Sequence, residues 1–221
     1  MNIWLVLTFI FALLEALAVS RNLPKLEHLA KPAVMVYLFL WLYFSTGLRG
    51  TAFWFGVGIL FSLVGDVLLM NPTNMMFFAG LVTFLFAHIF YIIGFRSELT
   101  TSTVWSLILM VLILVNGIRL VRRIIGAMQA KGENALVIPV IVYSLAISLM
   151  LYAAMSTLRD PGWKTNAALF VSLGAFLFYL SDMILAWDKF VSPIKNGRLF
   201  NIIIYHLGQI GLIAGVISQF S

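Results

Sequence analysis

The sequence predicts an all-α membrane protein, a bundle of about eight transmembrane helices that forms a single domain over residues 1–221. Three observations support this prediction. Hydrophobic residues make up 62% of the chain, charged residues only 10%, and the mean hydropathy is +1.06, values that do not suit a water-soluble domain. The apolar residues also gather in stretches of about 20 residues with short connections, which leaves no room for a separate soluble domain.

Each apolar stretch has the length that a helix needs to cross the hydrocarbon core. The first one lacks the basic segment and the small-residue cleavage site of a secretory signal peptide, so we expect it to be retained as a span. In chain order, the predicted spans are residues 2–20, 32–48, 52–70, 75–95, 103–120, 136–157, 165–187 and 199–219.

The basic residues predict the orientation of the bundle. Lys and Arg are concentrated in the connections after the odd-numbered spans, as is typical of cytoplasmic loops, so both termini are expected outside the cytoplasm. This arrangement suits a bacterial inner membrane. It also explains the net charge of +6 through contact with anionic headgroups, and nucleic acid is therefore not an expected partner. The chain has no cysteine, which excludes disulfides and thiolate nucleophiles.

Two aspartates lie inside apolar spans, Asp66 in the segment LFSLVGDVLL and Asp182 in LFYLSDMIL. A carboxylate at the centre of a membrane helix costs about 2.5 to 3.5 kcal/mol on insertion scales, so such residues usually face the bundle interior and carry function. Neither of these two spans contains Lys or Arg. The aspartates could have a structural role, as a hydrogen-bonded pair or in a salt bridge to a base at the cytoplasmic end of the bundle, such as Lys31 or Arg198. They could instead supply the acid and base of a catalytic site.

The two aspartate segments also suggest an internal repeat. Each Asp-bearing span is followed by a span with a histidine: Asp66 by His88, and Asp182 by His206. Two parallel four-helix halves would produce this order, although short segments rich in Phe and Leu also match by chance.

Other polar side chains lie at a depth similar to that of the aspartates. Glu15, Asn116 and His206 fall in the cytoplasmic part of their spans and could share one cavity with Asp66 and Asp182. A cavity of this kind would open to the inner leaflet.

Deeper polar residues would narrow this cavity, since His88 lies about 20 Å from the start of its span and Tyr91 lies beyond it. Each polar residue also has a structural interpretation. Glu15 could be a packing residue, and Asn116 and Gln209 are expected to form interhelical hydrogen bonds. Two buried histidines and two aspartates without a ligand-spacing motif are a weak metal signal, so we expect no metal and no cofactor.

The order and spacing of several short motifs over nearly the whole chain resemble those of the lysoplasmalogenases, also called YhhN-like membrane proteins. One position departs from the family pattern, because His206 stands where a second aromatic residue, usually Tyr, is expected beside Tyr205. The motifs are Lys31-Pro32, Gly65-Asp66-Val67-Leu68-Leu69-Met70, Phe78-Ala79-Gly80-Leu81 with Phe84, Ala87-His88 with Tyr91, Gly174-Ala175 with Phe178, Ser181-Asp182, Tyr205 and Gln209.

The resemblance implies a membrane hydrolase that cleaves the vinyl ether bond of lysoplasmalogens. Its substrates would be lysoplasmenylethanolamine or lysoplasmenylcholine, its co-substrate water, and its products a fatty aldehyde and glycerophosphoethanolamine or glycerophosphocholine. Protonation of the β-carbon of a vinyl ether gives an oxocarbenium ion that water then attacks. Such a reaction needs a proton donor and an anionic group, much as glycoside hydrolysis does. Asp66 and Asp182 match this need, and which of them donates the proton stays open.

The remaining expected site follows from the lipid nature of the implied substrate and from the positions of the polar residues. Lys31 lies at the rim, where it and Arg198 have the charge to bind a headgroup phosphate, although snorkelling explains them equally well. Apolar residues of spans three, four and seven would line a tunnel for the alkenyl chain. The expected substrate-binding residues are Glu15, Lys31, His88, Tyr91, Ser181, Tyr205, His206 and Gln209.

Two other functions fit some of these residues. Intramembrane carboxyls and histidines are also the parts of proton relays, so a proton-coupled transporter of a small molecule or a lipid is the main alternative. A metal-dependent membrane amidase such as an alkaline ceramidase would need three histidines around zinc. Since His28 is expected in a loop, it is a poor third ligand.

Overall fold

The computed structural model describes residues 2–71, 73–95 and 104–221, and all the regular structure in these ranges is helical. This part of the chain contains eight helices long and apolar enough to cross a membrane, which confirms the predicted fold class. The helices are α1 (Ile3–Ser20), α2 (Pro24–Thr46), α3 (Ala52–Leu69), α4 (Asn74–Phe95), α5 (Val104–Ala130), α6 (Val137–Ser156), α7 (Thr165–Ala186) and α8 (Gly197–Phe220), with short helical segments η1 (Asn134–Leu136), η2 (Thr157–Arg159) and η3 (Trp187–Val191).

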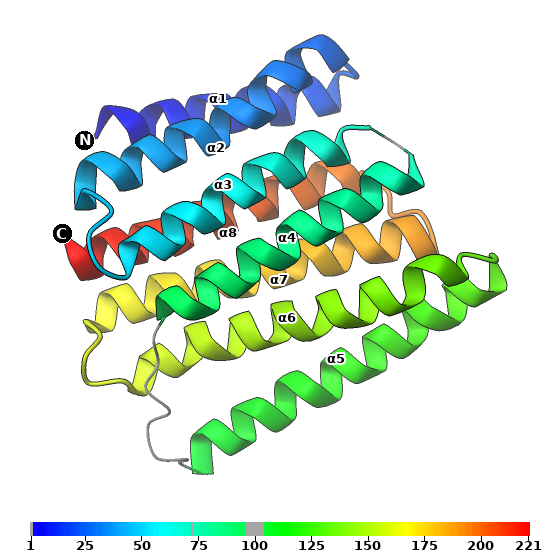
Figure 1. Ribbon diagram of the computed structural model, residues 1–221. Helices are drawn as coiled ribbons and strands as arrows, with labels where there is room; N and C mark the ends of the chain where they lie inside the picture. Colours follow the sequence, from blue (N-terminus) through cyan, green and yellow to red (C-terminus); the bar gives the residue numbers. More distant parts are fainter. Residues whose placement is uncertain (1, 72, 96–103) are drawn as a thin grey trace.

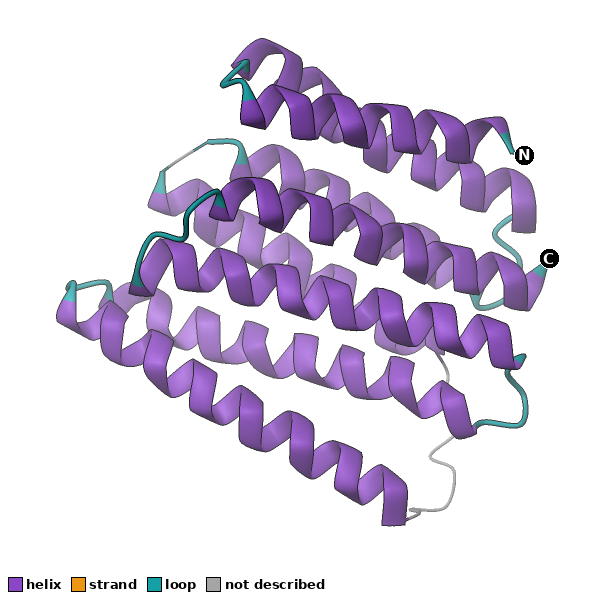
Figure 2. Ribbon diagram, turned by 180° about the vertical axis from the view of Figure 1, so that it is seen from behind, coloured by secondary structure: helices purple, strands orange, loops and turns teal. Residues whose placement is uncertain are grey.

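The helices run roughly side by side, and the loops lie at the two ends of the bundle (Figure 2). The pair α1 and α2 lies at one edge and α5 at the other, while both termini lie at the same end (Figure 1). Helices adjacent in sequence form the closest pairs, α7 with α8, α3 with α4 and α1 with α2, and α4 also packs against α6. The opposite end, where α1 joins α2, α3 joins α4 and α7 joins α8, is called the rim below.

Glycines allow α7 and α8 to approach very closely. A Cβ atom on Gly174 would lie 2.3 Å from the backbone nitrogen of Leu212, and one on Gly208 would lie 2.7 Å from that of Phe178. Small residues at a contact between membrane helices let the two backbones pack together. This contact fixes the part of α8 that carries the polar residues of the site.

Helix α2 begins eight residues earlier than expected, because the polar residues before Pro32 form its first turns. Pro24 occupies the start of the helix, where a missing N–H is tolerated, and Pro32 lies inside it. The prediction that placed Lys31 in a connection is therefore wrong. As a residue of α2, Lys31 can extend along the bundle interior toward α3.

Helix α5 extends to Ala130, ten residues beyond its predicted end, while its predicted first residue, 103, lies outside the described residues. The extension carries the two buried residues of this helix, Ile124 and Met128. They pack with Phe77 of α4 and Phe190 of η3 in a small apolar cluster near the rim. The remaining surface of α5 is largely exposed and apolar.

Candidate active site

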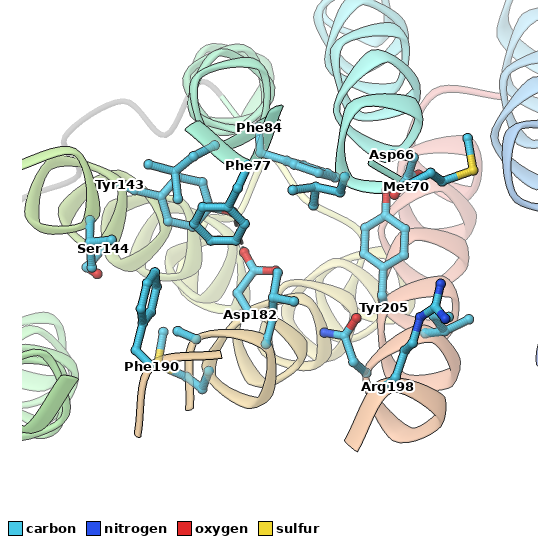
Figure 3. Close-up of a pocket in the computed structure, with 18 of the residues that line it drawn as sticks. Asp66, Met70, Phe77, Phe84, Tyr143, Ser144, Asp182, Phe190, Arg198 and Tyr205 are labelled. Carbon is cyan, nitrogen blue, oxygen red and sulfur yellow. Dashed lines mark hydrogen bonds between the residues drawn. The ribbon is translucent and has the colours of Figure 1, made fainter. Parts of the chain in front are cut away.

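Asp66 and Asp182 line the same cavity, which has a volume of about 120 Å³ and lies in the rim half of the bundle. Figure 3 shows Asp66, Tyr205 and Arg198 on one side of it, Tyr143 and Ser144 on the other, and Asp182 between them. Apolar side chains of α3, α4, α6, α7 and η3 fill most of the remaining wall, among them Leu69, Met70, Phe77, Leu81, Phe84, Val140, Leu185 and Phe190.

The first aspartate has a tyrosine and a lysine as partners. The hydroxyl of Tyr205 donates a hydrogen bond to Oδ2 of Asp66 at 2.8 Å, and Nζ of Lys31 lies 3.6 Å from Oδ1. Asp66 is only 2% exposed and the Lys31 side chain 12%, so the ion pair is largely shielded from water. Of the interpretations that the sequence left open, a salt bridge to Lys31 therefore applies to Asp66.

The second aspartate has a different environment. Tyr143 of α6 donates a short hydrogen bond to Oδ2 of Asp182, and Nε2 of His88 lies 3.0 Å from the Tyr143 oxygen and 3.8 Å from Oδ2. A phenol has one proton, so if Tyr143 gives it to Asp182, the His88 nitrogen must be the donor in the other contact. Within the described residues, Asp182 has no Lys or Arg partner at ion-pair distance.

Tyr143 was missed by the sequence interpretation. The ring of tyrosine is largely apolar, so its presence in the apolar segment VIPVIVYSL gives little signal. Asn201, which lines the cavity and donates to the carbonyl oxygen of Ser181 at 2.6 Å, was missed for a similar reason. Only the folded bundle brings these residues beside the aspartates.

Gln209 joins three helices behind Asp66. Its oxygen accepts a hydrogen bond from Tyr91 at 2.9 Å, and its nitrogen donates to Ser62 at 3.1 Å and to the Tyr205 oxygen at 3.4 Å. The expected interhelical role of Gln209 is thus confirmed. Tyr91 and Gln209 do not line the cavity, and they reach it through Tyr205.

Ser181 and His88 also lie behind the cavity wall. The Ser181 hydroxyl donates to the carbonyl oxygen of Phe178 at 2.7 Å and lies 3.5 Å from Oδ1 of Asp182. Both Ser181 and His88 are fully buried. Among the expected substrate-binding residues, Lys31 and Tyr205 are the ones that line the cavity.

Glu15 and His206 form a separate buried pair between α1 and α8. Nε2 of His206 contacts Oε2 of Glu15, and neither residue lines the cavity. Asn116 is exposed and donates to the carbonyl oxygen of Leu112 in its own helix at 2.8 Å. The expectation that Glu15, Asn116 and His206 share the aspartate cavity is therefore wrong, because residues at equal depth can lie on helix surfaces that face in different directions. The expected interhelical hydrogen bond of Asn116 is also wrong, because its side chain bonds within its own helix.

The rim of the cavity is charged. Arg198, at the start of α8, forms an ion pair with Glu27 of α2, and both residues line the cavity with Lys31. The Arg198 side chain is 61% exposed and that of Glu27 8%. The rim thus offers two cations and one anion close to the two aspartates.

The histidines do not assemble into a metal site within the described ranges. His28 contacts the carbonyl oxygen of Pro24, His88 contacts Tyr143, and His206 contacts Glu15. The described residues contain no group of three or more His, Asp or Glu side chains arranged to hold a metal ion. The donor set that a zinc amidase needs is therefore absent from this part of the chain.

Comparisons with known proteins place this chain among relatives that share one family name. The model of the YhhN family matches residues 26–216. Lysoplasmalogenase TMEM86B from Mus musculus is 29% identical over 201 residues, which cover 86% of this chain and 74% of the mouse protein. Lysoplasmalogenase TMEM86B from Sus scrofa is 31% identical over 161 residues, 73% of this chain and 62% of the pig protein.

A second group of relatives has a related name. Lysoplasmalogenase TMEM86A from Homo sapiens is 29% identical over 160 residues, which cover 69% of this chain and 60% of the human protein. No solved structure gives a significant match. The resemblance identified from the sequence motifs is confirmed by the family match, and the chain belongs to the YhhN family.

Proposed function

We propose that this protein is a membrane hydrolase that cleaves the vinyl ether bond of lysoplasmalogens, with Asp66 and Asp182 as its catalytic residues. The observation that carries the proposal is the shared cavity, which holds both carboxyls among apolar side chains below a charged rim. The names of the relatives support the reaction. The substrate would be a lysophospholipid with an ethanolamine or choline headgroup, and water the second reactant.

The reaction needs two opposite properties from the site. A proton is first transferred to the β-carbon of the vinyl ether, and positive charge develops on the α-carbon and the ether oxygen. Water then adds to the α-carbon, and the resulting hemiacetal collapses to the aldehyde and the free glycerol hydroxyl. A proton donor and a negative group must therefore flank the vinyl ether, as two carboxyls do in glycoside hydrolysis.

The different partners of the two aspartates favour one division of roles. Lys31 lies beside Asp66 and supplies the counter-charge of a carboxylate, so we assign Asp66 to stabilising the oxocarbenium ion. Asp182 has Tyr143 and His88 as its polar neighbours and no Lys or Arg at ion-pair distance among the described residues, and we assign it to proton donation. Tyr143 and His88 would then form the path that returns a proton to Asp182 after each turnover.

The charged rim gives the headgroup a place to bind. Arg198 and Lys31 would contact the phosphate, for which Arg in particular has suitable geometry. Glu27 would face the ammonium group of ethanolamine or choline. This arrangement places the glycerol carbons just below the rim, and the vinyl ether beside the two aspartates.

The test is aldehyde release by the detergent-purified protein from a lysoplasmalogen, beside Asp66→Asn and an ester lysophospholipid as controls. We expect aldehyde from the vinyl ether lipid alone and none from Asp66→Asn. The absence of aldehyde in several detergents and with both headgroups would overturn the proposal and favour the transporter. Aldehyde release that Asp66→Asn retains would place the chemistry elsewhere.

A further inference from the structure

A second cavity lies between α5, α6 and α7, on the side of the bundle away from α1 and α2. Its volume is about 280 Å³, and its wall includes Leu114, Gly117 and Ile118 of α5, Ser148 of α6 and Tyr179 of α7. Most of the wall is apolar, and the Ser148 hydroxyl donates to the carbonyl oxygen of Ser144 at 2.7 Å. Because that hydroxyl already has a hydrogen-bond partner, it does not need a polar ligand. We call this cavity the α5 groove.

The α5 groove adjoins the aspartate cavity. Ser144 of α6 and Met183 of α7 line both cavities, so they form the wall between them. In Figure 3, Ser144 lies at the end of the aspartate cavity away from Arg198, with Asp182 between the two. A molecule whose polar end lies at Arg198 would therefore direct its other end toward the α5 groove.

The loose packing of α5 explains why the groove exists. Its two buried residues, Ile124 and Met128, lie near the rim, where α5 contacts η3. Farther from the rim the apolar side chains of this helix are exposed, Val111 for example by 53%. Figure 1 shows α5 at the edge of the bundle, with α6 as its neighbour. The groove is thus a space beside a membrane-facing helix, where an apolar ligand can enter from the lipid.

The direction of the groove matches a lipid that stays in its leaflet. From Ser144 to Ser148, and from Arg122 to Leu114, the wall runs away from the rim, over about 12 Å for the second pair at 1.5 Å per residue. A lysolipid with its headgroup at the rim extends its single chain in the same direction, toward the middle of the bilayer.

We infer that the α5 groove binds the alkenyl chain of the substrate. The inference rests on the proposed function and deepens it, because it moves the chain site from spans three, four and seven to α5, α6 and α7. The chain would pass from the vinyl ether at Asp182, across Ser144 and Met183, and into the groove. Affinity for the substrate should therefore rise with chain length until the groove is filled, since each further methylene gains packing contacts with the groove wall.

Gly117 gives the sharpest test. A Cβ atom there would lie 3.6 Å from both the Ser148 and the Tyr179 hydroxyl oxygens, an ordinary contact, so a larger side chain would project into the groove without displacing backbone. We expect Gly117→Phe to raise KM for a long-chain lysoplasmalogen about tenfold or more, with a much smaller change for a short-chain analogue. Gly117→Leu should have the same effect to a smaller degree.

Val111→Phe is the matched control, because Val111 lies on the same helix, is exposed and does not line the groove. Val111→Phe should leave both substrates unaffected, and the thermal stability of all variants is measured alongside. If Gly117→Phe raised KM equally for long-chain and short-chain substrates, or for neither, the inference would be overturned. The proposed function would still stand in that case, provided that the wild type releases aldehyde.

A binding measurement separates the two proposals if the wild type releases no aldehyde. A saturated ether lysolipid, which cannot be cleaved, would carry a photoreactive group at the end of its chain. We expect it to label residues of the α5 groove in the wild type, and far fewer in Gly117→Phe. Labelling confined to other helices would refute the chain site whatever the activity.

Discussion

The two aspartates are similar in sequence context but differ in their partners. Both are surrounded by Leu, Phe and Val in the sequence, which is why their importance could be predicted from it. Their partners could not, because Tyr205 lies 139 positions away from Asp66 in the chain and Tyr143 lies 39 away from Asp182. A pattern in one helix carries no information about the residue that a neighbouring helix presents.

Replacing each carboxyl by an amide tests the pair. Asp66→Asn and Asp182→Asn should each lower turnover by at least about 100-fold, since positioned acids and bases contribute about 10²- to 10⁴-fold. Thermal stability should stay close to wild type, because the amide keeps the shape of the side chain and Lys31 can extend to the rim. Aldehyde release and a melting curve check both expectations.

His206→Gln is the comparison for these variants, because His206 contacts Glu15 and does not line the cavity. It should reduce activity less than either aspartate variant. A loss as deep as theirs would give the Glu15 and His206 pair a catalytic role, and unfolding of both aspartate variants would return the aspartates to a structural role.

Tyr143→Phe tests the proposed proton path. The phenylalanine removes the hydrogen bond to Asp182 and the contact with His88 but keeps the ring in place. A positioned group that transfers a proton contributes about 10²- to 10⁴-fold, and Asp182 itself stays in place, so kcat should fall about 10- to 100-fold while KM changes little. Tyr37→Phe, whose ring packs against Phe11, should have wild-type kinetics. A rise in KM alone would assign Tyr143 to substrate binding.

At the scale of helices, hydropathy predicted each span but not where polar residues extend it. The prediction failed at the start of α2 and at the end of α5, since Lys25, Glu27, Arg122 and Arg123 interrupt the apolar pattern although the helix continues through them. The first error matters most, because it placed Lys31 in a connection and hid the ion pair with Asp66. A helix can continue past the hydrocarbon core through such residues, because long basic side chains extend to the headgroups.

The contact between α7 and α8 should be sensitive to one methyl group. Gly174→Ala places a Cβ atom 2.3 Å from the backbone of α8, so the helices must separate, at a cost of about 1–3 kcal/mol. A lower melting temperature and reduced activity should follow together, because Tyr205 moves with α8. Gly126→Ala, where a Cβ atom has no neighbour within 4 Å, should be neutral or stabilising by up to about 1 kcal/mol. Equal effects of the two substitutions would contradict the tight packing.

At the scale of the whole molecule, the packing favours the internal repeat, which remains a prediction. If α1–α4 correspond to α5–α8, then Asp66 on α3 is contacted from α2 and α8, and Asp182 on α7 from α6 and α4. These are equivalent helices under a twofold axis along the membrane normal. Each half therefore supplies part of the environment of both carboxyls. Lys31 in one half and Tyr143 in the other break this symmetry, as two different catalytic roles require.

The orientation of the bundle is the remaining prediction at this scale, and the cysteine-free sequence makes it easy to test. The excess of basic residues at the rim predicts that this end lies in the cytoplasm, so the headgroup site would face the inner leaflet. Ser221, at the opposite end, and Gln129, in the last turn of α5 near the rim, are both exposed and allow single-cysteine variants. A membrane-impermeant maleimide should label Ser221→Cys in intact cells and Gln129→Cys only after the membrane is opened. The reverse pattern would place the rim outside, and the enzyme would then draw its substrate from the outer leaflet.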